Sequence, residues 1–228
     1  MRDLSTRTFE RILLVKPSSL GDVIHALPVL HGLRTRYPTA RIDWLIAPAF
    51  APLIEGHPDL SEAVLFDRRQ YGAIGRRWSA TLDFLRFVVE LRDRRYDLVI
   101  DLQGLFRSGF LARATGAPVR LGFRNGREGS PLFYTDLIET PDPNAHAVDR
   151  NMLVAGWLGF ANAHVRFDLV LTQVEQDAAG RLLNEAGIAP GPSVVAVFPG
   201  ARWETKLWPV ERFAGAVERL IQAGLRGV

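Results

Sequence analysis

Short apolar runs alternate with stretches of helical periodicity along almost the whole chain, which predicts strands separated by helices. The expected strands cover 11–16, 41–47, 62–66, 97–102, 118–123 and 193–198. The expected helices cover 22–36, 79–95, 105–115, 146–158, 174–187 and 210–223. Two segments rich in Gly, Pro and Arg, 67–78 and 124–145, are expected to form loops. The alternation predicts an α/β fold with a mostly parallel sheet covered on both faces.

The pattern starts again near residue 173. A helix closes at Gly187, a Pro/Gly turn follows, and a new buried strand begins at Ser193. We therefore expect one domain over 1–172, then a linker helix and a second α/β domain over 173–228. Because a domain commonly needs about 100 residues or more, the second domain is expected to be incomplete.

Composition narrows the class of protein. The 228 residues include no cysteine, which excludes disulfides, thiolate metal sites and cysteine nucleophiles. No apolar run approaches the roughly 20 residues that cross a bilayer, and the start of the chain has no signal-peptide pattern. These features predict a soluble cytoplasmic protein.

Positive charge is concentrated in one part of the chain. Residues 68–127 contain 13 Arg and five acidic residues, although the whole chain carries a net charge of only +3. Such a region favours an anionic partner such as a phosphate, a lipid head group or a nucleic acid. Solvated arginines on helix surfaces are the alternative. Nucleic acid is disfavoured because no RNA- or DNA-binding motif is recognisable.

Lysine is rare, and both lysines stand in glycine-bearing loops. Of the 28 basic residues, only Lys16 and Lys206 are lysine. A compact ammonium group suits a phosphate or carboxylate in a tight pocket where a guanidinium would not fit. With only two lysines, chance is the alternative explanation.

The first of these loops follows the first expected strand. In an open parallel sheet, ligands bind beyond the carboxyl ends of the strands, and the first such loop is a favoured place. Lys16, Ser18 and Ser19 supply a cation and hydroxyls, and Gly21 permits a close backbone approach. Asp22 opens the following helix, so it is either a site carboxylate or a cap at the helix N-terminus. The loop lacks the G-x-G-x-x-G pattern of dinucleotide enzymes.

The second loop, Phe198–Pro209, holds an equivalent position after the strand 193–198. Gly200 and Ala201 turn the chain with small residues, and Lys206 stands just before the next helix. A glycine turn, a lysine and a helix N-terminus together are typical of phosphate binding. A tight turn with a solvated lysine is the alternative.

Two further polar segments are expected at the same sheet edge. Gln103, Gly104 and Arg107 follow the strand 97–102, and Arg127 lies in the polar loop after the strand 118–123. Each signal is weak alone, but one cleft could collect them all.

Taken together, these segments resemble the heptosyltransferases of lipopolysaccharide core assembly, glycosyltransferase family 9. The matching motifs are "KPSSLGDVIHALP", "HPDL" and "FPGARWETKLWPVERFA". Three further segments, "YDLVIDLQGLFRSG", "REGSPLFY" and "HAVDRN", are similar to the branch that adds the first heptose to Kdo on lipid A. The resemblance covers most of the chain. It implies the GT-B architecture, in which two Rossmann-like, doubly wound parallel-sheet domains face a cleft; here the second is only begun.

The resemblance also implies a function and roles for the candidate residues. It implies inverting transfer of heptose from ADP-heptose to Kdo of Kdo-lipid A, without metal or cofactor, by a protein peripherally associated with the cytoplasmic face of the inner membrane. Asp22 would be the general base on the acceptor hydroxyl. The implied donor-binding residues are Gly200, Ala201, Arg202, Thr205 and Lys206. The implied acceptor-binding residues are Lys16, Ser18, Ser19, Gly21, Arg68, Arg69, Arg76, Arg77, Gln103, Gly104, Arg107 and Arg127.

The chain departs from the family in its last part. The family's second domain carries an Asp-Thr-Gly…His segment that closes on the donor nucleotide, and residues 193–228 do not supply it. We therefore expect an incomplete donor site and no turnover by these 228 residues alone. The alternatives are a non-catalytic module that binds the anionic glycolipid, or a family member with another donor or a later heptose position.

Overall fold

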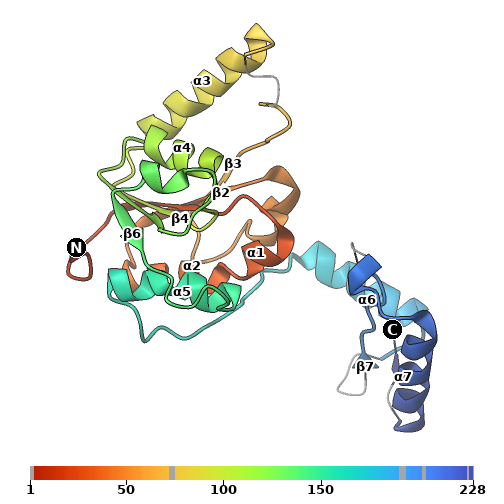
Figure 1. Cartoon of the computed structure of the whole chain (residues 1–228). Helices are drawn as coiled ribbons and strands as arrows, with labels where there is room; N and C mark the ends of the chain where they lie inside the picture. Colours follow the sequence, from red (N-terminus) through yellow and green to blue (C-terminus); the bar gives the residue numbers. More distant parts are fainter. Residues whose placement is uncertain (1–2, 72–74, 190–193, 202–203, 225, 228) are drawn as a thin grey trace. The chain divides into compact units, whose positions relative to one another are not determined.

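The computed structural model describes residues 3–71, 75–189, 194–201, 204–224 and 226–227. Arg202 therefore lies outside the described residues. The chain divides into two compact units, Met1–Val170 and Leu171–Val228 (Figure 1). The expected assignment of acceptor binding to 1–172 and donor binding to 173–228 stays a prediction.

A six-stranded parallel sheet forms the centre of the first unit. Its strand order is β3-β2-β1-β4-β5-β6, and every neighbouring pair runs parallel. This is the order of a Rossmann sheet, so the predicted doubly wound α/β fold is confirmed. The strands are β1 Arg11–Val15, β2 Arg41–Ile46, β3 Glu62–Leu65, β4 Leu98–Asp101, β5 Val119–Phe123 and β6 Asp136–Ile138.

Helices cover both faces of this sheet. They are α1 Leu20–Ile24, α2 Leu27–Arg36, α3 Trp78–Asp93, α4 Phe106–Ala114 and α5 Ala147–Leu158. Because successive strand residues point to opposite faces, Ile12 and Leu14 of β1 pack in the core under α2 and α5, while Leu13 and Val15 pack in the core under α3 and α4. Figure 1 shows these two pairs of helices on opposite sides of the sheet. Burial on both faces explains why β1 reads as an unbroken apolar run.

Two sequence predictions for this unit were wrong. The segment 22–36 was expected to be one helix, but it is divided into α1 and α2. Pro28 lies in the first turn of α2, where its missing N–H costs nothing, whereas inside a continuous helix it would break the ladder. The segment 124–145 was expected to be loop, but it contains the 3₁₀ helix Ser130–Phe133 and the strand β6. Only three residues long and opened by an aspartate, β6 has no readable alternation.

The second unit contains α6 Gln173–Glu185, β7 Val194–Val195, the 3₁₀ helix Glu204–Lys206, α7 Val210–Gln222 and β8 Arg226–Gly227. The strand β7 pairs in parallel with β8. Thr172 caps α6: its hydroxyl accepts a hydrogen bond from the Glu175 backbone N–H, and the Glu175 carboxylate accepts one from the Thr172 N–H in return. The strand expected over 193–198 is confirmed only at 194–195, and residue 193 is not among the described residues.

Candidate active site

The candidate residues of the first unit lie where three neighbouring strands end. Val15 of β1 is level with Asp101 of β4, which is level with Gly122 of β5. Because the strands are parallel, the loops that follow them leave the sheet at one edge. These loops bring together segments more than 80 residues apart in the sequence.

Lys16 is the first residue beyond β1, and its position is fixed from both sides. Its backbone carbonyl accepts a hydrogen bond from the Trp44 indole N–H at 3.1 Å. Its side chain is buried, and Nζ donates to the Leu102 carbonyl at 3.2 Å. Nζ also lies 3.6 Å from Oδ1 of Asp22, whose side chain is 38% exposed. A buried cation thus lies beside a partly exposed carboxylate.

The two oxygens of Asp22 do different things. Oδ2 accepts hydrogen bonds from the Ser19 backbone N–H at 3.0 Å and from the Ser19 hydroxyl at 2.8 Å. These bonds are the helix-cap role that the sequence left open. Oδ1 makes no hydrogen bond within the described residues and faces Lys16. Asp22 therefore caps α1 with one oxygen and offers the other to the site.

The environment shifts the pKa of both groups downward. Partial burial by itself would raise the pKa of Asp22, but the Ser19 N–H and the Lys16 charge outweigh it, so the pKa lies below the ordinary aspartate value. Burial lowers the pKa of Lys16, and the Asp22 carboxylate opposes that change. Asp22 is consequently ionised throughout the neutral range.

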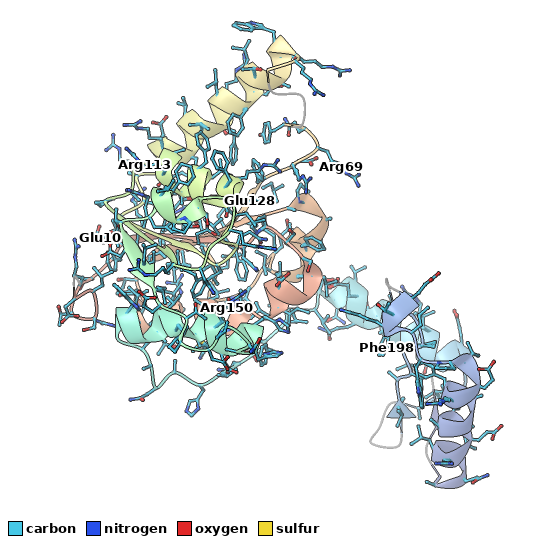
Figure 2. The ribbon with its side chains drawn as sticks, in the orientation of Figure 1. Glu10, Arg69, Arg113, Glu128, Arg150 and Phe198 are labelled. Atoms are coloured by element: carbon cyan, nitrogen blue, oxygen red, sulfur yellow. The ribbon has the colours of Figure 1, made fainter. Side chains whose placement is uncertain are left out.

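Lys16 and Asp22 open into a polar cavity of about 230 Å³. Its wall consists of loop residues from three strand ends together with Arg150 of α5, which Figure 2 labels. The lining residues are Lys16, Asp22, Leu102, Gln103, Gly104, Phe123, Asn125, Gly126, Arg127 and Arg150. Two buried atoms here, Oε1 of Gln103 and Nε of Arg150, have no hydrogen-bond partner among the described residues.

Asp101 at the end of β4 holds the Gln103 segment in place. Its side chain is fully buried, and Oδ1 accepts from the backbone N–H groups of Gln103 at 2.8 Å and Gly104 at 3.1 Å. Oδ2 accepts from the Tyr134 hydroxyl at 2.7 Å. Burial raises the pKa of Asp101 despite these donors. The Gly104 carbonyl in turn accepts from the Arg127 N–H at 2.8 Å, which connects this loop to the next.

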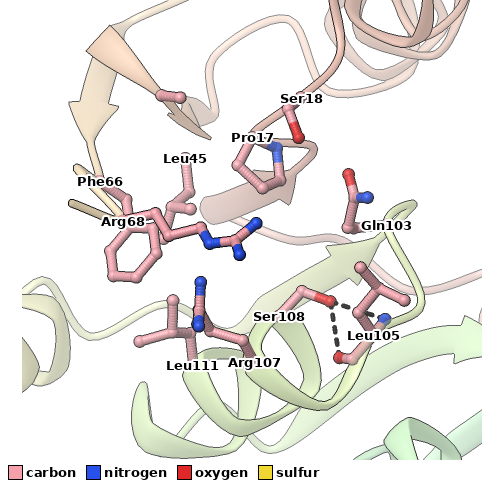
Figure 3. A pocket seen from close by; sticks show the side chains of 11 residues that line it. Pro17, Ser18, Leu45, Phe66, Arg68, Gln103, Leu105, Arg107, Ser108 and Leu111 are labelled. Carbon is pink, nitrogen blue, oxygen red and sulfur yellow. Dashed lines mark hydrogen bonds between the residues drawn. The ribbon is translucent and has the colours of Figure 1, made fainter. Parts of the chain in front are cut away.

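A second cavity of about 200 Å³ adjoins the first and shares Gln103 with it. Figure 3 shows the guanidinium groups of Arg68 and Arg107 both reaching into it. Ser18 and Gln103 supply the other polar groups near its mouth. Neither arginine has an ion-pair partner in the part of the chain that the structure describes. Two unpaired cations in one cavity favour an anionic ligand. The rest of the lining consists of Pro17, Leu45, Ala47, Phe66, Leu105, Ser108 and Leu111.

The structure thus divides the predicted acceptor residues into groups. Lys16, Gln103, Gly104 and Arg127 line the polar cavity, while Ser18, Arg68 and Arg107 line the second cavity with Gln103. Arg107 therefore lines a cavity with Arg68, and Arg127 lines a different cavity with Asp22.

The remaining predicted acceptor residues lie outside these two cavities. Arg69 lines a shallow hollow beside Arg68. Arg76 and Arg77 are exposed at the start of α3 and line none of the described cavities. Gly21 has no left-handed φ, and a Cβ there would meet nothing within 4 Å, so the fold gives no steric reason for glycine.

Sequence reasoning missed two residues that shape the site. Arg150 belongs to the segment "HAVDRN", but nothing in a helix pattern shows that its guanidinium turns toward strand ends far away in sequence. In the structure that guanidinium stacks over Phe123, 5.7 Å from the ring centroid. Asp101 carried a signal that was overlooked, because a carboxylate closing an otherwise apolar buried strand needs partners.

The predicted donor residues lie in the second unit. Gly200 and Ala201 lie in an exposed extended segment, and Thr205 and Lys206 lie in the 3₁₀ helix that precedes α7. Pro209 directly precedes α7, at its N-cap. The phosphate site expected over these residues stays a prediction.

Metal-ligating side chains do not gather in the described ranges: no three His, Asp or Glu residues there could hold an ion together. The expectation of a metal-independent reaction stays a prediction.

Comparison with known proteins identifies the family. The profile of glycosyltransferase family 9 (heptosyltransferase) matches residues 84–227. Lipopolysaccharide heptosyltransferase 1 of Pseudomonas aeruginosa is 32% identical over 224 residues, covering 94% of this chain and 59% of that protein. Matches also include lipopolysaccharide heptosyltransferases 2 and 3.

Solved structures of heptosyltransferases and of a related family 9 protein align with most of the chain. The E. coli heptosyltransferase WaaC with ADP-2-deoxy-2-fluoro heptose aligns with a TM-score of 0.69 and 28% identity over 95% of this chain and 67% of WaaC. A family 9 glycosyl transferase from Veillonella parvula aligns with a TM-score of 0.78 over 99% of this chain and 62% of its own, at an identity of 22% that supports the fold alone. The chain spans about 60% of the length of the curated relatives it matches. It belongs to glycosyltransferase family 9, the heptosyltransferases.

Proposed function

We propose that the complete protein is an inverting glycosyltransferase that moves heptose from ADP-heptose to Kdo of Kdo-lipid A. The heptosyltransferase 1 relatives support the first heptose position, and the heptose nucleotide bound to WaaC supports the donor class. The proposed location is the cytoplasmic face of the inner membrane, where the protein would be peripherally bound. Because the chain spans only part of its relatives, activity, donor and acceptor are proposals for the whole protein.

The observation that carries this proposal is the second oxygen of Asp22. Asp22 lines the polar cavity, and its Oδ1 stays free of the helix-cap hydrogen bonds that engage Oδ2. An ionised carboxylate there suits a general base. It would take the proton of an acceptor hydroxyl as that oxygen bonds to the anomeric carbon. The bond from that carbon to the diphosphate breaks at the same time, and ADP leaves with the electron pair on the opposite face.

The cations around the cavity suit an acidic acceptor sugar. Arg127 and Arg150 share the cavity wall with Asp22, and a Kdo carboxylate would pair with such guanidinium groups. Lys16 has a different role: together with the Ser19 N–H, its charge holds the Asp22 pKa below its ordinary value. Lys16 is therefore proposed as a positioning residue, with Asp22 as the catalytic residue.

For the donor, we propose that Lys206 and the neighbouring Gly200–Ala201 segment stabilise the negative charge on the leaving diphosphate. Backbone N–H groups near Gly200 and Ala201, the Thr205 hydroxyl and the start of α7 would complete an anion site. Arg202 belongs to the same predicted set.

Incubation of the complete gene product with ADP-heptose and Kdo-lipid A tests the proposal. Mass spectrometry should show the acceptor gaining one heptosyl group while ADP is released. An acceptor that already carries the first heptose serves as the control and should gain little. Preferential use of that control would assign the protein to a later heptose position. Saturable acceptor binding with no ADP release would instead support a non-catalytic glycolipid-binding module.

A further inference from the structure

The helix α3 has two apolar faces, although a surface helix needs only one. Its inner face packs against the sheet and against α4, and the residues that form it are Ala80, Phe84, Phe87 and Leu91. The opposite face is apolar as well, and the residues that form it are Trp78, Leu82, Leu85 and Val89. Both sets follow spacings of four, three and four residues, which is the repeat of a single helical stripe. We call the second set the outer stripe.

The outer stripe lies in solvent within the first unit. Trp78 is 79% exposed, Val89 57%, Leu85 52% and Leu82 36%. Single exposed apolar residues are ordinary, but a continuous stripe along a helix marks an interaction surface. The neighbouring α4 adds two exposed aromatic residues, Phe106 and Phe110.

The N-terminal end of α3 is basic, and this positive charge does not stabilise the helix. Arg76 and Arg77 come directly before Trp78, and the first turn contains no acidic residue. Arg77 holds the N-cap position without a side-chain hydrogen bond. Cations at a helix N-terminus oppose the helix dipole, and arginine is not a favoured cap. These charges are better explained by an external anionic partner.

A groove between α3 and α4, on the inner side of α3, shares residues with the cavities of the candidate active site. This groove of about 390 Å³ is lined by Phe84 of α3, by Phe106 and Phe110 of α4 and by Arg68 and Arg107. The two arginines also line the second cavity, which shares Gln103 with the Asp22 cavity. Three cavities that share lining residues thus extend from Phe84 of α3 to Asp22. Arg69, next to Arg68 in the chain, points away from the body of the unit in Figure 2.

We propose that the outer stripe and the basic end of α3 dock on a lipid bilayer with anionic head groups. An apolar stripe next to clustered arginines matches the two components of such a surface. An exposed tryptophan among arginines is typical of residues at the bilayer interface. No helix in the described ranges is long and apolar enough to cross a membrane. The proposal rests on the proposed function, whose acceptor is itself a lipid.

Vesicle sedimentation of the complete protein tests this surface directly. Vesicles of phosphatidylethanolamine and phosphatidylglycerol should bind the protein, and vesicles of pure phosphatidylcholine should bind it weakly. Trp78→Gln with Leu85→Gln should weaken binding at least about tenfold, since both stripe residues then face the bilayer as polar groups. Arg76→Gln with Arg77→Gln should weaken it by roughly fivefold per arginine. Glutamine preserves helix propensity, and circular dichroism checks that the fold is kept.

Matched changes elsewhere on the surface serve as controls. Leu65→Thr alters a residue that is 48% exposed on β3, and Arg113→Gln alters an exposed arginine at the end of α4. Both controls should bind vesicles like the unchanged protein. Equal binding by the stripe variants, or a wild-type protein that ignores anionic vesicles, would overturn the proposal. A stripe variant that changes only self-association would assign the stripe to a second copy of the chain and would overturn it as well.

A transfer assay separates this inference from the proposed function. Trp78→Gln with Leu85→Gln should reduce transfer to Kdo-lipid A in vesicles while leaving transfer to a soluble, acyl-free acceptor unchanged. Loss of transfer to both acceptors would contradict a docking role. Absence of transfer by the unchanged protein would count against the proposed function, and vesicle sedimentation would still test the docking surface.

Discussion

Nζ of Lys16 lies 3.6 Å from Oδ1 of Asp22, while the other carboxylate oxygen accepts two hydrogen bonds from Ser19, the N-cap residue of α1. This arrangement joins two readings of Asp22 that the sequence left as alternatives. The cap fixes the direction of the carboxylate, because Oδ2 is held by both the N–H and the hydroxyl of Ser19. The remaining oxygen makes no hydrogen bond among the described residues and faces Lys16.

Replacing Asp22 with asparagine should separate catalysis from stability. The amide oxygen can still accept the bonds from Ser19, so the free energy of unfolding should change by less than about 1 kcal/mol. Loss of the general base should lower kcat by about 10²–10⁴-fold. Initial rates of ADP release, with thermal unfolding of the same samples, give both quantities.

Asp142→Asn is the matched control for that variant. Asp142 also accepts a backbone hydrogen bond, from Asn144 at 2.8 Å, but it lines none of the described cavities. It should keep its full rate. Comparable rates for the Asp22 and Asp142 variants would remove Asp22 from the mechanism.

Lys16→Met should move the acid limit of activity toward higher pH. The Lys16 charge helps to hold the Asp22 pKa below its ordinary value, so removing that charge raises the pKa and protonates the base earlier on acidification. A profile of kcat against pH measures the shift. An unmoved acid limb would show that Lys16 does not act through Asp22.

The same pair predicts a sign for stability. A lowered carboxylate pKa stabilises the folded state above the unfolded value of about 3.8, and that contribution is lost as pH falls through the folded pKa. The Lys16→Met variant should therefore lose less stability on acidification than the unchanged protein. At neutral pH it should be nearly as stable, since a methionine of similar length avoids burying a charge. Unfolding by urea at several pH values tests both statements.

The sequence was sufficient for the sheet and for the first loop. Apolar runs such as 97–102 mark buried parallel strands because both faces are covered, and the loop from Lys16 to Asp22 follows from the rule that ligands bind at strand ends. The different roles of the two Asp22 oxygens were not predictable, because a carboxylate at a helix N-terminus can either cap the helix or serve a site. Only the hydrogen bonds from Ser19 show which oxygen caps the helix.

The grouping of the arginines depends on tertiary structure that a linear pattern does not carry. Arg107 and Arg127 follow neighbouring strands and were both expected at one edge of the sheet. In the structure Arg107 of α4 lines a cavity with Arg68, and Arg127 of the loop after β5 lines another cavity with Asp22. Arg150 reaches the cavity from a helix after β6, a strand whose three residues gave no periodic signal. Side-chain direction at the end of an element, rather than the element itself, decides these neighbours.

Asp101→Asn should leave the stability of the fold nearly unchanged, whereas Asp101→Ala should lower it. Asparagine keeps an acceptor for the Gln103 and Gly104 N–H groups and removes a buried charge whose pKa burial has raised, so stability at neutral pH should change by less than about 1 kcal/mol. Alanine leaves those N–H groups unpaired, at a cost of roughly 1–3 kcal/mol each. Chemical denaturation of the two variants distinguishes them, and equal losses would contradict the role given to the carboxylate.

Arg107→Gln should act on acceptor binding more than on chemistry. Its guanidinium shares a cavity with Arg68 but lines no wall with Asp22, so KM for the acceptor should rise about tenfold while kcat changes little. The effect should shrink in Arg68→Gln, because both residues face one anion. Kinetics of the two single variants and the double variant measure this coupling. Strictly additive losses would indicate two separate sites.

Gly104 and Gly116 allow backbone strain to be separated from a local effect on the site. Both adopt a left-handed φ, of +66° and +74°, and neither offers a close clash to an added Cβ. Alanine at either position should thus cost a similar roughly 1–2 kcal/mol of stability. Only Gly104 connects the Gln103 segment to Arg127, through a carbonyl that accepts the Arg127 N–H at 2.8 Å. Gly104→Ala should therefore raise the acceptor KM several-fold more than Gly116→Ala does at equal loss of stability. Steady-state kinetics at a temperature where both variants are fully folded makes the comparison, and equal KM values would show that this connection does not position the site.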